Sequence, residues 1–297
     1  MIKQLAIVSF TVLYLLGCMQ NGARDEAKPG RIISLSPNIT ETIFALGAQD
    51  LLIGVSDFCN YPPQTRQKTR VGGLLNPNLE RIIALQPDLL LATPASKNLA
   101  IQLSQRGIRC VLLSNIRLQD IFTTIDSIGI LCGISARADS LINAIKDSLF
   151  VYRQRASNVK ADAPKALFIL HRDPGTTRNI SVIGSQTFTN DLWHLLGGRN
   201  AFERAGLQYA QLNDESLFTI NPDLIIEFKF NQQWDEEKRR RNKKEWRSLQ
   251  QLKAVQRGQI YVIDGNYSLI PGPRVVRLLR DYYRIMKQYR ETGKSNE

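Results

Sequence analysis

The chain has 297 residues, of which 43% are hydrophobic and 22% are charged. This is the composition of an ordinary globular protein and excludes an intrinsically disordered one. The formal net charge of +12 would suit a nucleic-acid-binding protein. Much of the excess, however, lies in one run, residues 238–247, with no recognition helix or zinc-ligand spacing around it. We interpret this run as a solvated helical face and expect no nucleic-acid partner.

The N-terminus indicates the compartment. Residues 5–16 are almost wholly apolar and follow the positive charge of Lys3, which is typical of a signal-peptide core and too short for a membrane span. The run ends in Leu-Leu-Gly-Cys18, which resembles the box at which lipoprotein signals are cleaved and lipid is attached to the cysteine. A plain secretory signal with an incidental cysteine is the alternative. We predict a signal peptide over 1–17, lipidation at Cys18, a flexible tether over 18–30, and a membrane-anchored protein in the periplasm or on the cell surface.

Three more cysteines follow, at positions 59, 110 and 132. An odd number cannot pair fully within one exported chain, and the spacing matches no metal site. Buried free thiols are the default expectation, and any pairing stays open.

Beyond the tether, short strands alternate with helices, which predicts a parallel α/β unit. In chain order we expect strand 31–36, helix 38–46, strand 51–56, helix 79–85, strand 89–92, helix 99–106 and strand 109–114.

The middle of the chain is predicted to be helical. One helix covers 118–130, and a second begins at Ser135 and continues to about residue 158. The second has apolar residues at helical spacing and would be roughly 35 Å long at 1.5 Å per residue, about the height of a lobe. We therefore predict connecting helices over 118–160, between an N-terminal lobe over 31–117 and a C-terminal lobe over 161–297.

The pattern of the first lobe then restarts. Residues 80–91, Glu-Arg-Ile-Ile-Ala-Leu-Gln-Pro-Asp-Leu-Leu-Leu, recur at 215–226 as Glu-Ser-Leu-Phe-Thr-Ile-Asn-Pro-Asp-Leu-Ile-Ile. The other expected elements follow the order of the first lobe: strand 165–170, helix 187–196, helix 215–220, strand 224–228, helix 246–254 and strand 257–264, before a final helix at 274–290. The predicted fold class is α/β: two similar lobes with parallel sheets, joined by one long backbone helix, with a ligand cleft between them.

Motifs for catalysis are missing from the sequence. There is no Gly-x-Ser-x-Gly, no supportive Cys/His spacing and no Gly-rich phosphate loop after a strand, and the two histidines, His171 and His194, are too few for a multi-histidine metal site. We expect no enzyme, no catalytic residue and no resident cofactor. Glu80 and Glu215 each begin a predicted helix, where a carboxylate favours the helix dipole. The alternative is that the matched pair grips a two-fold-related partner carrying Arg or Lys.

At this point the chain resembles the substrate-binding proteins of ABC importers for cobalamin, iron-siderophores and haem, the type built on a helical backbone. The resemblance covers about residues 31–289. It rests on Ile-Ser-Leu-Ser-Pro-Asn-Ile-Thr-Glu at 33–41, Asn-Tyr-Pro-Pro at 60–63, the Asn-Leu-Glu segment from 78 to 89, Ile-Gly-Ser-Gln-Thr-Phe-Thr-Asn-Asp-Leu at 183–192, Leu-Leu-Gly-Gly-Arg-Asn-Ala at 195–201 and Pro-Gly-Pro-Arg at 271–274.

The resemblance implies capture of a cobalt or iron chelate and its delivery to a dimeric permease with its ATPase. It also implies that Glu80 and Glu215 dock onto arginines of the permease. A haem receptor of the same type, a chelate-processing enzyme on the same architecture, and a sensory or scaffold lipoprotein are the alternatives.

The cobalamin-binding members of the family, which this chain resembles most, line their cleft with aromatic residues. By motif position, Phe58 and Tyr209 keep a ring, whereas Leu74 and Thr93 stand where those proteins have tryptophans. Tyr61, close to Phe58, offers partial compensation. Because flat rings grip a corrin or porphyrin, the missing pair leaves the identity of the chelate open.

His171 and Arg172 follow the first strand of the second lobe, where a strand end faces the cleft. Arg172 suits carboxylates of a ligand, and His171 suits the metal inside the ligand, through a neutral imidazole. Ordinary loop hydrogen bonds are the alternative for both. Arg274 either points to the cleft or simply begins the last helix, and His194 is expected at a packed helix position.

Overall fold

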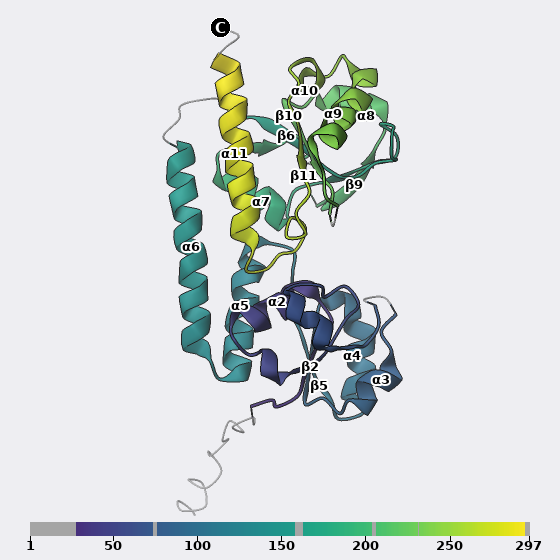
Figure 1. Cartoon of the computed structure of the whole chain (residues 1–297), viewed down its shortest axis with the longest axis vertical. Helices are drawn as coiled ribbons and strands as arrows, with labels where there is room; N and C mark the ends of the chain where they lie inside the picture. Colours follow the sequence, from purple (N-terminus) through teal and green to yellow (C-terminus); the bar gives the residue numbers. More distant parts are fainter. Residues whose placement is uncertain (1–27, 74–75, 158–162, 204–205, 231, 295–297) are drawn as a thin grey trace, which may run out of the picture.

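The computed structural model describes residues 28–73, 76–157, 163–203, 206–230 and 232–294. Two α/β lobes lie one above the other along the long axis, and a long helix, α6 (Ser135–Ser157), runs beside both (Figure 1). This is the predicted architecture of two lobes and one backbone helix. Cys18, the predicted signal peptide and Leu74 lie outside the described residues.

The N-terminal lobe contains an all-parallel sheet in the order β3-β2-β1-β4-β5. Its strands are β1 (Ile32–Ser34), β2 (Leu52–Val55), β3 (Thr69–Arg70), β4 (Leu89–Ala92) and β5 (Arg109–Leu112). Its helices are α2 (Pro37–Ala45), α3 (Leu79–Ala84) and α4 (Lys97–Ser104), with short 3₁₀ turns η1 (Gln49–Leu51), η2 (Pro63–Gln67) and η3 (Pro94–Ser96).

The C-terminal sheet runs β11-β10-β6-β7-β9, with β8 beside β6. Its strands are β6 (Lys165–His171), β7 (Ile180–Ile183), β8 (Arg199–Asn200), β9 (Tyr209–Leu212), β10 (Leu224–Phe228) and β11 (Ile260–Ile263). The expectation of a parallel sheet is wrong for part of this lobe, because β7 is antiparallel to both β6 and β9. A short turn suffices for an antiparallel return, and residues 172–179 supply it with Gly175 and Asn179 in the left-handed region.

The repeat extends into the details of the two lobes. In each lobe three parallel strands stand in the same order, β1-β4-β5 and β6-β10-β11. Helix α8 (Asp214–Ile220) matches α3, and each begins after an asparagine whose side chain accepts a hydrogen bond from a backbone N–H of the first turn: Asn78 from Arg81 and Asn213 from Ser216, both at 2.9 Å.

The Pro-Asp step of the repeat has a structural role in both lobes. Asp88 accepts the backbone N–H of Gly30, and Asp223 accepts that of Lys165, each at 2.9 Å. Gly30 and Lys165 lie at or just before the first strand of their lobes. Each aspartate therefore anchors the chain where it enters the sheet, so the repeated sequence specifies a repeated hydrogen bond.

The basic run forms helix α9 (Glu236–Glu245), and its residues are mostly exposed, as predicted for a solvated helical face. The predicted helix at 246–254 is wrong. Only a 3₁₀ turn, η4 (Trp246–Leu249), and a single turn, α10 (Lys253–Gln256), occupy it. The helix forms earlier because Asp235 caps it through the N–H of Lys238, with acidic residues in its first turn and lysines in its last.

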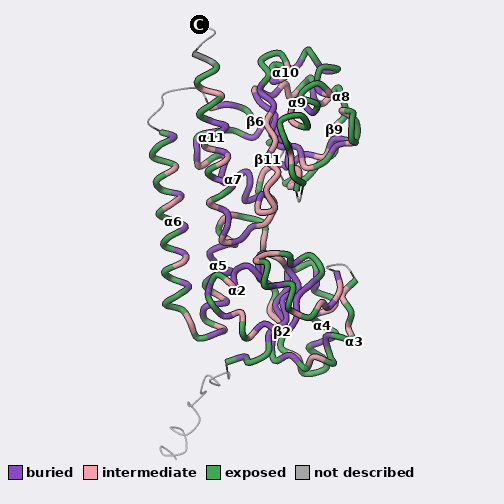
Figure 2. Tube along the Cα trace, viewed as in Figure 1, coloured by how far each residue is buried: buried purple, intermediate pink, exposed green. Residues whose placement is uncertain are grey.

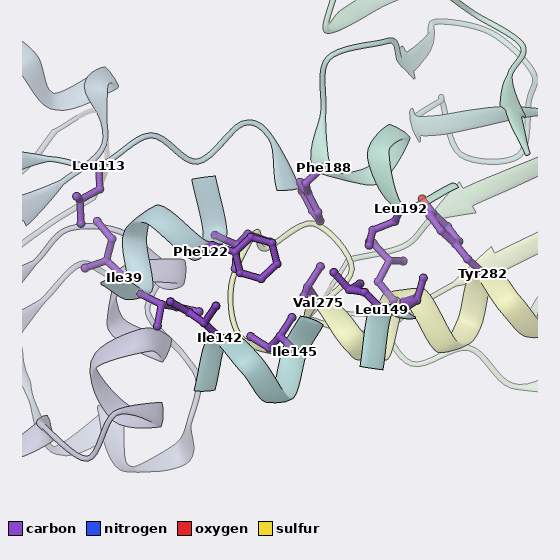
Figure 3. Packing of buried hydrophobic residues seen from close by; sticks show 14 of the residues in the cluster. Ile39, Leu113, Phe122, Ile142, Ile145, Leu149, Phe188, Leu192, Val275 and Tyr282 are labelled. Atoms are coloured by element: carbon purple, nitrogen blue, oxygen red, sulfur yellow. The ribbon is translucent and has the colours of Figure 1, made fainter. Parts of the chain in front are cut away.

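One apolar core runs continuously from the first lobe to the second. It passes from α2 through α5 (Leu118–Cys132) and α6 to α7 (Phe188–Leu195) and α11 (Val275–Lys294), as Figures 2 and 3 show. Buried residues along the way include Ile39, Phe122, Ile145, Leu192 and Tyr282. Two smaller clusters cover the opposite faces of the sheets. Because the helices between the lobes share this core, we expect the lobes to move little relative to each other.

No helix in the described part of the chain has the length and apolarity needed to cross a bilayer.

Candidate ligand cleft and docking surface

The cleft lies where the carboxyl ends of the parallel strands of the two lobes face each other. Two loop segments meet across the lobes: the N–H of Phe188, in the segment after the antiparallel strand β7, donates to the carbonyl of Ile116, which follows the parallel strand β5, at 2.7 Å. Arg117 forms a bidentate pair with Asp191 of α7, with N–O distances of 2.9 and 2.7 Å. Ligands of open α/β sheets bind beyond the carboxyl ends of the strands, so this junction defines the floor of the candidate site.

A buried ion pair closes the junction on the side of α2. Arg274, at the start of α11, donates through Nε and Nη2 to the two carboxylate oxygens of Glu41 on α2, at 2.8 and 2.5 Å. Arg274 is 8% exposed and Glu41 is 4% exposed. Burial raises the pKa of Glu41, and the hydrogen bond and charge of Arg274 oppose that rise. This pair ties one lobe to the other.

Two predicted cleft residues contact each other at the same place. The guanidinium of Arg274 stacks on the ring of Tyr61, with 3.8 Å between its central carbon and the ring centroid. Arg274 also donates to the side-chain oxygen of Asn266 at 2.6 Å. The N–H groups of Arg274 are thus bound to other protein groups. Arg274 holds the two lobes and the ring of Tyr61 in place, and it is not a free cation for a ligand.

Exposed rings remain on both lobes. Phe58, in the loop after β2, is 59% exposed, and Tyr209, at the start of β9, is 57% exposed. Tyr209 lines an apolar pocket of about 150 Å³ together with Leu170, Ile183, Phe188, Thr189 and Leu269. Phe188 also contacts the other lobe, so this pocket opens at the junction. The exposed ring of Tyr209 in the lining of an apolar pocket suits a ligand with a flat, apolar face.

Arg172 lies inside the C-terminal lobe, at 3% exposure. Its Nε donates to Glu227 at 2.9 Å, and its Nη2 donates to Asn242 at 2.6 Å and to Glu245 at 2.7 Å. Burial alone would raise the pKa of Glu227, but the charges of Arg172 and Lys229 outweigh it and hold that pKa below its ordinary value. Arg172 therefore forms a structural ion pair inside the lobe and does not make the ligand contact that we expected.

The other predicted residues are spread around the cleft. His171 is exposed at the last position of β6, and Thr93 is buried directly after β4. His194 is not packed as expected, since its side chain is 42% exposed and pairs with Glu203 at 2.8 Å. Burial raises the pKa of the Cys59 thiol, against hydrogen bonds with Ser56 and Thr40, so this cysteine is a buried neutral thiol.

Sequence reasoning missed the loop after β10. Lys229 lies directly beyond this strand, its ammonium is 5.4 Å from the ring centroid of Trp234, and Phe230 is 36% exposed. These residues follow β10 as Thr93 follows β4, and β10 matches β4 in the repeat. The segment after β10 therefore carries two rings where the segment after β4 has Thr93.

Glu80 and Glu215 take the same place in their helices. Each is the second helical residue, two positions after the capping asparagine, and each is exposed. Helices α3 and α8 both lie on the side of the molecule away from α6 (Figure 1). The helices that carry the two glutamates, one from each lobe, thus lie on one side of the protein.

In the described part of the chain, no three His, Cys, Asp or Glu side chains are grouped so that they would hold a metal ion.

Comparison with known proteins agrees with this geometry. Residues 32–267 match the family described as periplasmic binding protein. The chain belongs to this family. A relative in Bacillus subtilis, the uncharacterized ABC transporter substrate-binding lipoprotein YvrC, is 29% identical over 84% of this chain and 77% of its own length. The vitamin B12-binding protein of Vibrio cholerae is 29% identical over 86% of this chain and 89% of its own.

Solved structures of periplasmic binding proteins have the same architecture. A possible iron-binding protein from Staphylococcus epidermidis superimposes with a TM-score of 0.73 at 26% identity, over 87% of this chain and 99% of its own. The predicted family and fold are therefore confirmed, including the two lobes on a backbone helix.

Proposed function

We propose that this periplasmic binding protein is the lipid-anchored receptor of an ABC importer, which captures a cobalt or iron chelate in its cleft and delivers it to the permease. The transport role is supported by the family and by the description of YvrC as an ABC transporter substrate-binding lipoprotein. The chelate class is supported by relatives and structural neighbours described as binding vitamin B12 or iron.

The observation that carries the proposal is the matched presentation of Glu80 and Glu215. Two lobes that repeat one unit carry these carboxylates at the same helical position, on helices that lie on the same side of the molecule. A transporter dimer has two equivalent halves, so it offers the same cationic group twice. The apolar pocket beside Tyr209 offers a contact surface for the flat face of a chelate.

The ligand class is tested by tryptophan fluorescence of the soluble fragment 21–297. Trp193 and Trp246 are fully buried, whereas Trp234 lies in the loop beyond β10. Titration with cobalamin, cobinamide, haemin and ferric siderophores should give saturable quenching with one of them, and Trp234→Phe should remove most of that signal. Isothermal calorimetry on both proteins separates binding from light absorption by the ligand. If no chelate binds by calorimetry, the proposed substrate class is wrong.

A further inference from the structure

A second cavity, of about 650 Å³, lies in the C-terminal lobe and shares no lining residue with the pocket beside Tyr209. Its floor is strand β11, and its walls are α9 and α11, which flank that strand in Figure 1. Five cationic side chains line it, Arg239, Arg240, Lys243, Arg280 and Arg284, against three carboxylates, Glu236, Asp264 and Asp281. We refer to this cavity as the basic groove.

Three of these cations have no hydrogen-bond or ion-pair partner among the described residues. Arg239 pairs with Asp264 at 2.8 Å, and Arg284 lies 3.6 Å from Asp281. Arg240, Lys243 and Arg280 are exposed and make no hydrogen bond or ion pair with any residue that the structure describes. Unpaired cations on opposite walls of one groove create a positive potential that favours an anionic partner.

The floor of the groove is the open edge of a sheet. β11 pairs with β10 on one side, and within the described chain no strand pairs with its other side. The Nη1 of Arg239 donates to the carbonyl of Val262 at 2.8 Å, which shows that a backbone oxygen of β11 faces the groove. An extended peptide can join such an edge as a further strand, and its backbone N–H would take the place of Arg239 at the carbonyl of Val262.

The matching edge in the N-terminal lobe has different chemistry. β5 is also an edge strand, but the cavity beside it is lined by Ile101, Cys110 and Leu112, and Lys97 is its single cation. The repeat therefore accounts for an edge strand in each lobe, but it does not account for the positive charge beside β11. The charge comes from α9 and α11. Helix α9 lies between β10 and β11 as α4 lies between β4 and β5, but α9 brings three cations to its cavity where α4 brings Lys97 alone.

We propose that the basic groove binds an acidic, extended segment of a partner protein, which adds to β11 as a strand and places its carboxylates against Arg240, Lys243 and Arg280. The concave shape and the strand edge favour such a segment over a bilayer surface, because lipid headgroups in a flat layer would not reach the floor beside Tyr261 and Tyr267. The chelate of the cleft is not involved.

The test uses fluorescence anisotropy of a labelled short peptide of alternating glutamate and valine, with the fragment 21–297. Lys243→Glu combined with Arg280→Glu reverses one charge on each wall and should weaken binding about tenfold or more. Lys244→Glu combined with Lys287→Glu is the matched control, since it changes the net charge equally on the same two helices but outside the groove. The control should bind the peptide as the parent does.

Two further probes separate this proposal from its rivals. The same peptide with N-methylated backbone amides keeps its charge but cannot form the strand ladder, and it should bind much more weakly. Vesicles containing phosphatidylglycerol should bind no better to the parent than to the Lys243→Glu, Arg280→Glu protein. The proposal is overturned if the peptide does not bind, if the control variant loses binding equally, if N-methylation has no effect, or if only the vesicles depend on the groove.

Discussion

Arg274 and Glu41 form a buried bidentate ion pair that joins the first turn of the last helix to the first helix of the other lobe. Removing one partner of such a pair leaves an uncompensated buried charge, which costs about 3–5 kcal/mol. We expect Arg274→Gln to lower the free energy of unfolding by about that amount in urea denaturation. Arg284→Gln, on the exposed face of the same helix, should change it by less than about 0.5 kcal/mol.

The double variant Glu41→Leu, Arg274→Met sharpens this prediction. Replacing both charged side chains by apolar ones removes the attraction between the charges, but it also removes the cost of burying them. The double variant should therefore recover much of the stability that Arg274→Gln loses. A double variant that is less stable than the single one would contradict a buried charge as the source of the loss.

The ion pairs of Glu227 should make the stability of the folded protein depend on pH. Its pKa is lowered in the folded protein by Arg172 and Lys229 against the effect of burial. A carboxyl group with a lowered folded pKa contributes stability that is fully present above its ordinary pKa of 4.5 and is lost as the pH falls through the folded value. Glu227→Gln should therefore cost about 3–5 kcal/mol at neutral pH, and the difference from the parent should shrink in acid.

The measurement is urea denaturation of both proteins between neutral and acidic pH. Glu237→Gln, an exposed carboxylate in the first turn of α9, is the control and should parallel the parent at every pH. A Glu227→Gln deficit that stays constant down to acidic pH would contradict the role of its charge.

The capping asparagines should act independently of each other. Asn78→Ala and Asn213→Ala each remove one hydrogen bond to the first turn of a short helix and should each cost about 1 kcal/mol. Because the two helices lie in different lobes, the double variant should lose the sum of the two within about 0.5 kcal/mol. Strong non-additivity in chemical denaturation would show that the lobes are coupled more tightly than their shared core explains.

Most of the fold was predictable because the repeat carries local signals twice. The Asn caps, the Pro-Asp step and the apolar strands act within a few residues, so the sequence around Glu80 and Glu215 predicts α3, α8, β4 and β10. Strands β7 and β9 escaped prediction, since four-residue segments such as Ile180–Ile183 carry too little alternation to be distinguished from loops.

The side-chain partners in the site could not be predicted in the same way. Arg274 and Glu41 are 233 positions apart, and Arg172 and Glu227 are 55 apart. Nothing in the local pattern distinguishes an arginine that binds a ligand from one that meets a buried glutamate. The sequence therefore indicates which residues come near the cleft, and the tertiary structure decides which of them are free to bind.

The exposed rings should contribute directly to ligand binding. Phe58→Ala and Tyr209→Ala each remove a ring worth about 0.5–1.5 kcal/mol of contact with a flat ligand, which weakens binding between about twofold and tenfold. Ile101→Ala, an exposed apolar residue away from the cleft, is the control. Calorimetry with the chelate identified by fluorescence gives the affinities. Unchanged affinity in both ring variants would place the ligand elsewhere.

If Glu80 and Glu215 dock onto the permease, their loss should affect uptake of the chelate without affecting its binding to the protein. Glu80→Ala combined with Glu215→Ala should leave chelate affinity unchanged, because both side chains are exposed and neither lines the pocket beside Tyr209, and should abolish uptake by cells that depend on this receptor. The control is Asp139→Ala combined with Glu237→Ala, which removes two exposed carboxylates from α6 and α9 and should keep both properties.

Replacing both glutamates by aspartate is a second test, because it keeps the charges at the helix N-termini and should restore part of the uptake. Loss of chelate binding in the alanine variant, or normal uptake with it, would remove the docking role.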